Sequence, residues 1–177
     1  MISNKQIGYA FKTLLQISLL LLHHSCTSPA EEKSKITSTT YVVTHVIDGD
    51  TFWAKNKTQK VKVRLIGIDA PEMRTGYNDV LNEAGVIARN FLESLILKKE
   101  IKMEYDIDTK DRHGRTLAYV FLNDGTFVNA ELLKNGYART LTVPPNVKYA
   151  DVFSQLQKEA IIQKKGLWAS APDDLRK

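Results

Sequence analysis

The sequence predicts an α+β fold, a small five-stranded Greek-key β-barrel with three helices. Two observations support this prediction. Short segments rich in β-branched residues and segments of helical period follow the order three strands, a helix, two strands and two helices. The chain has 177 residues and an apolar fraction of 43%, which suffices for one domain with a hydrophobic core and a short extension.

The first three strands are expected at residues 41–47, 51–54 and 61–66. The first is rich in β-branched residues and ends at Asp48-Gly49, a pair typical of hairpin turns. The third begins by alternating, which predicts that Arg64 lies on the face opposite Val61 and Val63. Pro71 then ends the pairing, because proline cannot donate to a β-ladder.

The second half supplies two strands and the helices. Apolar residues at helical spacing predict a helix over residues 83–97. Strands are expected at 100–107 and 115–122, a short helix at 128–135 closed by Gly136, and a last helix at 149–165. Five short strands with a helix after the third are typical of the OB-fold, which commonly binds oligonucleotides.

The N-terminal residues 1–25 are typical of an export signal. Lys5 and Lys12 precede an apolar run, Leu14 to Leu22, that is shorter than the roughly 18 residues of a membrane-spanning helix. Ser25-Cys26 at its end resembles a bacterial lipoprotein signal, although His23 and His24 depart from the usual pattern. We therefore expect a cell-envelope lipoprotein attached to the membrane through a lipid on Cys26, or a secreted or periplasmic protein if Cys26 is not modified.

The remaining boundaries follow from composition. Residues 26–39 are polar and predict a flexible linker, residues 40–169 form the folded domain, and residues 170–177 form a tail. The formal charge of +5 favours polyanionic partners, although charge alone is weak evidence. The single cysteine excludes an internal disulfide, and neither a zinc spacing nor an EF-hand loop is present.

Five charged residues are candidates for chemistry. Taken singly, Asp50 in a turn, Asp69 and Glu72 in a loop, and Arg64 and Arg115 on strands are each more often structural. Together they offer carboxylates for a cation such as calcium, which prefers oxygen ligands, and an acid to hold a water. The two guanidinium groups match a phosphate and stay charged.

Three stretches resemble the signature blocks of the staphylococcal nuclease (thermonuclease) family, and the resemblance covers about residues 40–169. They are Ile47-Asp48-Gly49-Asp50-Thr51, Arg64-Leu65-Ile66-Gly67-Ile68-Asp69-Ala70-Pro71-Glu72 and Asp111-Arg112-His113-Gly114-Arg115-Thr116-Leu117-Ala118-Tyr119. Each block alone is weakly specific, whereas three blocks in order with every charged position filled are strongly specific.

The resemblance implies a monomeric, calcium-dependent phosphodiesterase acting on single-stranded or denatured DNA and RNA. By that resemblance Asp50, Asp69 and the carbonyl of Ala70 bind Ca²⁺, and Glu72 activates or orients the attacking water. Arg64 and Arg115 bind the phosphate and stabilise the transition state. Cleavage of the 5′ P–O bond leaves 3′-phosphorylated products.

Two departures bear on substrate affinity. His113 and Thr142 stand where family tyrosines flank the nucleotide, and the loop 73–82 holds Arg74 as its one basic residue. Two alternatives remain: a catalytically weak or silent OB-fold nucleic-acid-binding module, and an exported scaffold that uses the barrel for interactions alone. A silent module is expected to lack one of the five charged residues, and all five are present.

Overall fold

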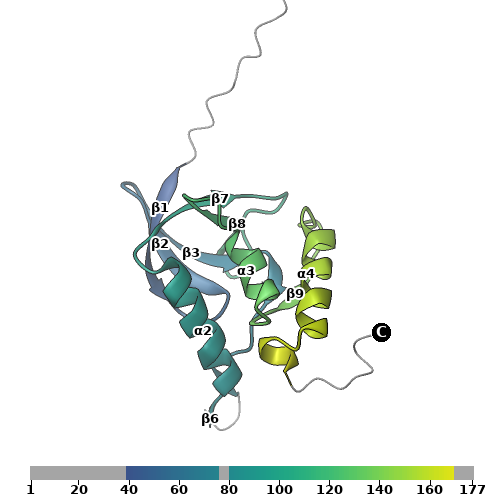
Figure 1. Cartoon of the computed structure of the whole chain (residues 1–177). Helices are drawn as coiled ribbons and strands as arrows, with labels where there is room; N and C mark the ends of the chain where they lie inside the picture. Colours follow the sequence, from purple (N-terminus) through teal and green to yellow (C-terminus); the bar gives the residue numbers. More distant parts are fainter. Residues whose placement is uncertain (1–38, 76–79, 170–177) are drawn as a thin grey trace, which may run out of the picture. The chain divides into compact units, whose positions relative to one another are not determined.

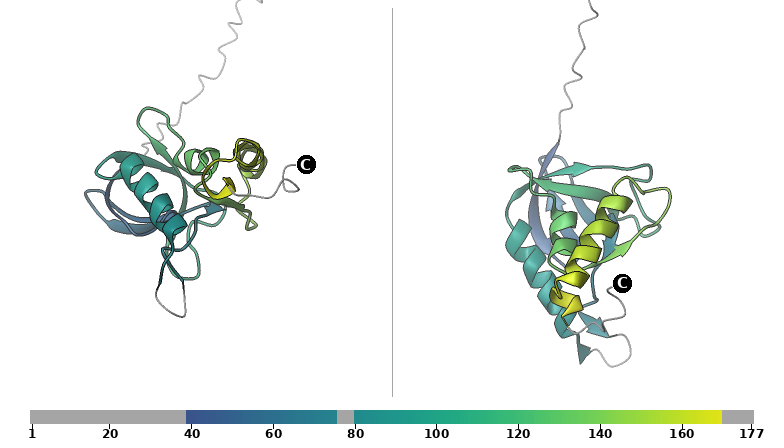
Figure 2. Two further views of the ribbon diagram at one scale, coloured as in Figure 1. Left: turned by 60° about the horizontal axis from the view of Figure 1, so that its bottom comes forward. Right: turned by 45° about the vertical axis from the view of Figure 1, so that its right-hand side comes forward.

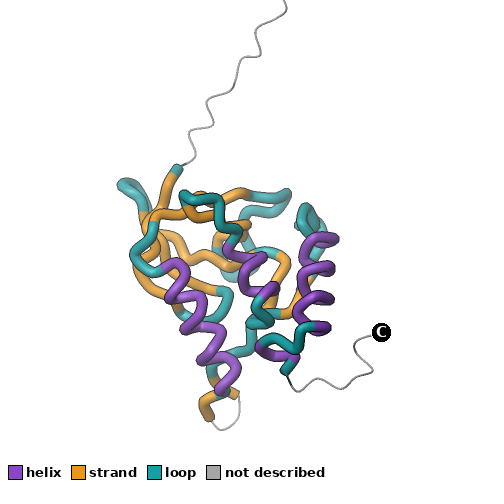
Figure 3. Tube along the Cα trace, viewed as in Figure 1, coloured by secondary structure: helices purple, strands orange, loops and turns teal. Residues whose placement is uncertain are grey.

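A closed five-stranded barrel forms the centre of the molecule. The computed structural model describes residues 39–75 and 80–169, so residues 1–25, Cys26, most of the linker and the tail lie outside the described residues. The strands neighbour one another in the order β1-β2-β3-β8-β7, which confirms the predicted barrel. Figure 1 labels these strands, and Figure 3 shows strands in orange. Their bounds are β1 Thr40–Val46, β2 Thr51–Lys55, β3 Lys60–Leu65, β7 Glu100–Glu104 and β8 Thr116–Leu122.

Three helices pack against the barrel, as expected. They are α2 (Glu83–Ile96), α3 (Val128–Lys134) and α4 (Ala150–Ile162), and the two views of Figure 2 show α3 beside α4. Asn82 caps α2, because its side chain accepts a hydrogen bond from the Ala84 N–H. Each helix buries an apolar side against the barrel, with Leu92, Leu132 and Phe153 almost fully enclosed. In the part of the chain that is described, no helix is long and apolar enough to cross a membrane.

The register of β3 determines what faces the core. Val63 and Leu65 are buried, so Arg64 between them points to the outer face, as the alternation predicts. β3 pairs antiparallel with β2 and parallel with β8, and in the second pairing Arg64 stands opposite Leu117. Arg64 therefore lies beside the start of β8, close to the turn that carries Arg115.

Short strands that the sequence pattern does not reveal extend the barrel. β4 (Gly67–Asp69) pairs with β9 (Arg139–Leu141), and β5 (Arg74–Thr75) pairs with β6 (Val80–Leu81). β4 is separate from β3 because Gly67, at φ 79°, turns the chain where the ring of Phe153 packs against it.

Two expected elements are shorter than predicted. β7 ends at Glu104 and not at residue 107, because Asp106 leaves the ladder and accepts hydrogen bonds from the Tyr119 hydroxyl and the Lys148 N–H. The last helix ends at Ile162, and a short 3-10 turn, η2 (Gly166–Trp168), follows it. Gly136 has φ 72°, which confirms it as the cap of α3.

Candidate active site

The turn between β1 and β2 carries Asp50 and packs unusually closely on its neighbours. A Cβ atom added at Gly49 lies 2.5 Å from the Cβ of Ala70 and 2.8 Å from that of Ala88. Gly49 does not have a positive φ, so the glycine is needed for this close approach and not for the hairpin conformation that its Asp-Gly sequence suggests. The contact brings the Asp50 turn against the loop that holds Asp69 and Glu72.

Asp50 is buried in this contact. One carboxylate oxygen accepts from the Ala70 N–H at 2.8 Å and lies 3.2 Å from an Arg64 nitrogen, and the other accepts from the Thr51 hydroxyl at 3.0 Å. Burial raises the pKa of Asp50 to about 7, outweighing the guanidinium of Arg64, which lowers it. The folded chain thus holds a carboxylate whose negative charge is only partly compensated.

Arg64 contacts both acids and the backbone of the site. Its Nη1 donates to the carbonyl oxygens of Leu65 at 2.9 Å and Ile68 at 2.8 Å, and its Nη2 lies 3.0 Å from Asp69 Oδ1. The guanidinium is therefore fixed by backbone oxygens while it bonds to both Asp50 and Asp69. The structure thus brings together three of the predicted residues around one planar group.

A cleft of about 200 Å³ opens beside Arg64. Arg64 and Arg115 both line it, together with Asp108 and Asp111. Its other wall is mostly apolar, with Leu117 from β8, Leu141 and the segment 143–146. Two guanidinium groups facing one cavity favour the binding of a phosphate group.

Asp111 holds Arg115 in place. Its Oδ2 accepts from Arg115 Nε at 2.6 Å, and its Oδ1 accepts from the backbone N–H groups of His113 and Arg115 at 2.9 Å. Burial alone raises the pKa of Asp111, but these hydrogen bonds outweigh it and hold the pKa below its ordinary value. The ionised Asp111 therefore fixes both the turn and the guanidinium.

Glu72 lies apart from the cleft. Its side chain is exposed, and it is not among the residues that line the cavity. Its backbone, however, packs tightly on α2, where a Cβ atom added at Gly85 lies 2.6 Å from the carbonyl carbon of Glu72. The position of the Glu72 loop is thus set by the absence of a side chain at Gly85.

The two positions that depart from the family pattern are both exposed. His113 accepts a hydrogen bond from Arg112 Nε at 3.1 Å, and Thr142 lies on the loop after β9. Neither residue lines the cleft. The predicted departure from an aromatic nucleotide clamp is therefore consistent with the largely aliphatic wall of the cleft.

The oxygen groups near Arg64 suit a hard cation. Across residues 39–75 and 80–169, no three His, Cys, Asp or Glu side chains come together as metal ligands. Asp50 and Asp69 share one guanidinium, and the Ala70 N–H donates to Asp50, so the backbone of Ala70 lies beside the two acids. Calcium accepts such a mixture of carboxylate, carbonyl and water ligands. The donor set therefore fits calcium.

Sequence reasoning alone did not assign roles to Gly49, Gly85 or Asp111. The glycines act through close contacts between distant segments, which no local pattern shows. The role of Asp111 was partly predictable, because an acid four residues before an arginine in a turn can form an ion pair with it.

Comparison with known proteins agrees with this geometry. Residues 62–170 match the family described as staphylococcal nuclease homologue. The chain is 42% identical over 128 residues to the thermonuclease of Staphylococcus intermedius, covering 72% of this chain and 75% of that protein. It is 39% identical over 131 residues to the thermonuclease of Staphylococcus hyicus, covering 74% and 76%. It is 35% identical over 127 residues to endonuclease YncB of Bacillus subtilis, covering 71% and 59%. With a five-stranded barrel and paired arginines on one cleft, the chain belongs to the staphylococcal nuclease family and is a nuclease.

Proposed function

We propose that the protein is a calcium-dependent nuclease that acts on single-stranded or denatured DNA and RNA. It hydrolyses the 5′ P–O bond and leaves 3′-phosphorylated products. One observation carries the proposal: Arg64 and Arg115 line the same cleft, while Arg64 also bonds to the carboxylates of Asp50 and Asp69. In this proposal the phosphate and the cation therefore bind next to each other.

The arginines bind the scissile phosphate in this proposal. Arg64 is fixed by the carbonyls of Leu65 and Ile68, and Arg115 is fixed by Asp111, so neither has to be ordered when the substrate arrives. Fixed donors aimed at developing charge stabilise the five-coordinate phosphorus more than the ground state.

Asp50, Asp69 and Glu72 have separate roles in the proposed reaction. Asp50, Asp69 and the carbonyl of Ala70 would hold calcium, which when bound supplies Lewis-acid polarisation of a phosphoryl oxygen. Glu72 takes a proton from the attacking water, whose oxygen bonds to phosphorus as the 5′ oxygen leaves and is protonated from solvent. The exposure of Glu72 fits contact with water.

The test is an assay of the full chain on denatured DNA and on RNA, with calcium or with a chelator. We expect cleavage with calcium and none with the chelator, and 3′-phosphate ends on the products. Undiminished cleavage in chelator would remove calcium from the proposal. Products with 5′-phosphate ends would contradict the assigned bond.

A substitution tests the role of Glu72. Glu72→Gln should lower kcat by about 10²–10⁴-fold with the melting temperature unchanged, because one general base is lost. Glu83→Gln is the matched control. Glu83 is also exposed, and this substitution removes the same charge at the start of α2. Equal activity of Glu72→Gln and the control would show that Glu72 is not the base.

We further propose an exported monomer that is attached to the membrane by a lipid on Cys26. The sequence of residues 1–26 supports this, with basic residues, an apolar run and a small residue before the cysteine. Mass spectrometry of the native protein should show an acylated N-terminal Cys26, and an unmodified N-terminus elsewhere would refute it. Sedimentation of the full chain in detergent tests the monomer.

A further inference from the structure

The outer face of β2 and β3 carries a row of basic side chains that the cleft does not explain. Residues 51–64 contain five basic residues and no acidic one. They are Lys55, Lys57, Lys60, Lys62 and Arg64. We name Trp53, Lys55, Lys60 and Lys62 together the lysine face.

The pleat of the two strands places these side chains together. Val63 and Leu65 face the core, so Lys60, Lys62 and Arg64 share the outer face of β3, about 6.6 Å apart along the strand. In the register with β2, Lys62 stands opposite Trp53 and Lys60 stands opposite Lys55. The result is a double row of side chains running along the strand toward Arg64.

In the described part of the chain these lysines are not paired with acids, although Glu100 lines the same surface pocket as Lys55. In residues 39–75 and 80–169, none of Lys55, Lys60 and Lys62 makes an ion pair. Lys60 Nζ instead lies 4.8 Å from the centre of the Trp53 ring, which holds the ammonium group over the face. Like charges directly opposite each other, as at Lys55 and Lys60, destabilise a sheet, and a bound polyanion relieves that repulsion.

The lysine face continues directly into the cleft. Arg64 connects the two, since it follows Lys62 on the outer face of β3 and lines the cleft. From Lys60 to Arg64 the strand spans about 13 Å. In OB-folds the face of the second and third strands is a common contact surface for oligonucleotides.

We propose that the lysine face is a second nucleic-acid contact surface, which holds the phosphates of the single strand as it leaves the cleft. This inference rests on the proposed action on single strands and names how a long substrate is captured. Lys60 and Lys62 contact successive phosphates, and the half-buried Trp53 keeps Lys60 oriented. The surface thereby supplies affinity that the cleft, with its aliphatic wall, lacks.

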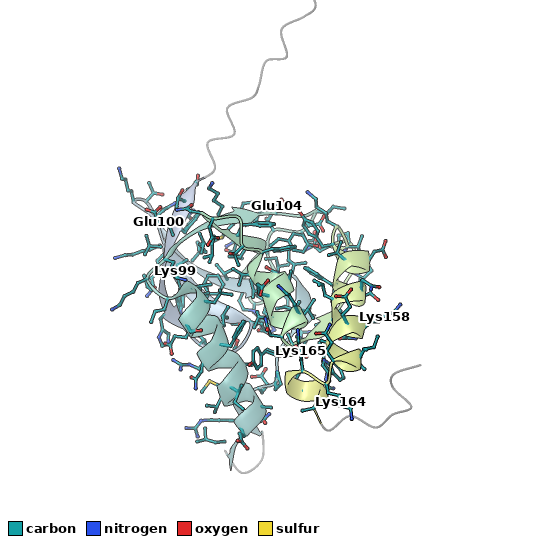
Figure 4. The ribbon with its side chains drawn as sticks, viewed as in Figure 1. Lys99, Glu100, Glu104, Lys158, Lys164 and Lys165 are labelled. Atoms are coloured by element: carbon teal, nitrogen blue, oxygen red, sulfur yellow. The ribbon has the colours of Figure 1, made fainter. Side chains whose placement is uncertain are left out.

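Lys158 of α4 and Lys164, which follows that helix, offer a matched comparison. Figure 4 shows Lys158 and Lys164 on the side of the molecule away from Lys99, which precedes β7. Both are exposed, and α4 also carries Asp151 and Glu159, whereas residues 51–64 contain no acid. Neutralising these two lysines removes the same total charge as neutralising Lys60 and Lys62.

The experiment measures kcat and KM of the full chain on a dinucleotide and on a single strand of about 12 nucleotides, within the size range that one OB-fold covers. The double variant Lys60→Ala with Lys62→Ala should raise KM for the long strand about tenfold and leave the dinucleotide unaffected. A plot of log(kcat/KM) against log salt has a negative slope, and this slope should become shallower by about 1.4, or about 0.7 for each lost phosphate contact. The double variant Lys158→Ala with Lys164→Ala should change neither quantity.

A binding measurement in chelator separates this inference from the proposed function. Trp53 emission should change when the long strand binds, and the change should disappear in Trp53→Phe. If the wild type cleaves but the Lys60 and Lys62 variant matches the α4 control on the long strand, the inference is wrong and the nuclease stands. If the Lys60 and Lys62 variant loses affinity for vesicles of anionic lipid and keeps its affinity for DNA, the lysine face binds a membrane surface. The inference is then also wrong. If the wild type cleaves neither DNA nor RNA, the proposed function itself fails.

Discussion

Gly85→Ala tests whether a helix controls the position of the proposed catalytic base. Gly85 lies in the first turn of α2, and its missing side chain lets the Glu72 loop pack on the helix. An added Cβ lies 2.6 Å from the carbonyl carbon of Glu72 and 2.8 Å from the Cα of Met73. Carbon atoms in contact lie about 3.5 Å apart or more, so the loop has to move by about 1 Å.

The expected result follows from two opposing effects. Alanine favours a helix over glycine by about 1 kcal/mol, whereas overpacking costs about 1–3 kcal/mol. We therefore expect a loss in the free energy of unfolding of about 0–2 kcal/mol. The larger effect is on catalysis, because a displacement of about 1 Å near a reacting group lowers kcat/KM by about 100-fold.

The assay combines urea unfolding with kcat/KM on denatured DNA. The control compares Asn90→Ala with Asn90→Gly at an exposed position of the same helix, where alanine should be more stable by about 1 kcal/mol and activity should not change. If Gly85→Ala stabilises the protein by that same amount and keeps wild-type kcat/KM, the loop is not held by this contact and the reasoning is refuted.

Three further substitutions test the site. Burial raises the pKa of Asp50 from 3.8 to about 7, so the metal-free folded chain binds a proton more tightly than the unfolded chain and loses stability as pH rises from about 4 to about 7. Asp50→Asn should therefore raise Tm above wild type in chelator at pH 8 and not at pH 4, and an equal gain at both values would contradict the assignment. Asp111→Asn should raise KM by about tenfold, since the charged hydrogen bond to Arg115 weakens, and an unchanged KM would show that Arg115 orients itself. Asn129→Ala should lower the free energy of unfolding by about 2–5 kcal/mol in urea, because the buried side chain bonds to the Val120 N–H and the Ile66 carbonyl, and a loss below 1 kcal/mol would show that water replaces it.

The sequence predicts the barrel well because its strands follow a local rule. Alternation in β3 places Val63 inside and Arg64 outside, and the structure agrees. β4 and β9 have no such signal, because each has three residues and is stabilised by pairing with a segment about seventy residues away. Their existence depends on the turn at Gly67 and the packing of Phe153, which are tertiary effects.

The site, like the fold, can be predicted from the sequence only in part. The charged residues could be selected from the sequence, because only a few residue types bind phosphate and cations. What the sequence does not reveal is how Arg64 links the two acids to the cleft, or that Glu72 lies outside the cleft lining. The lysine face was also missed, because only the register shows that Lys62 stands opposite Trp53 on the outer surface.

The parallel pairing of β3 with β8 has a consequence for how the chain folds. Arg64 and Leu117 are neighbours across that pairing, although more than fifty residues separate them in the chain. Contacts between distant segments form late, because the loop entropy must be overcome before they stabilise the chain. The chain therefore gains its paired arginines only after β8 has docked on β3, so catalytic activity reports completion of the barrel.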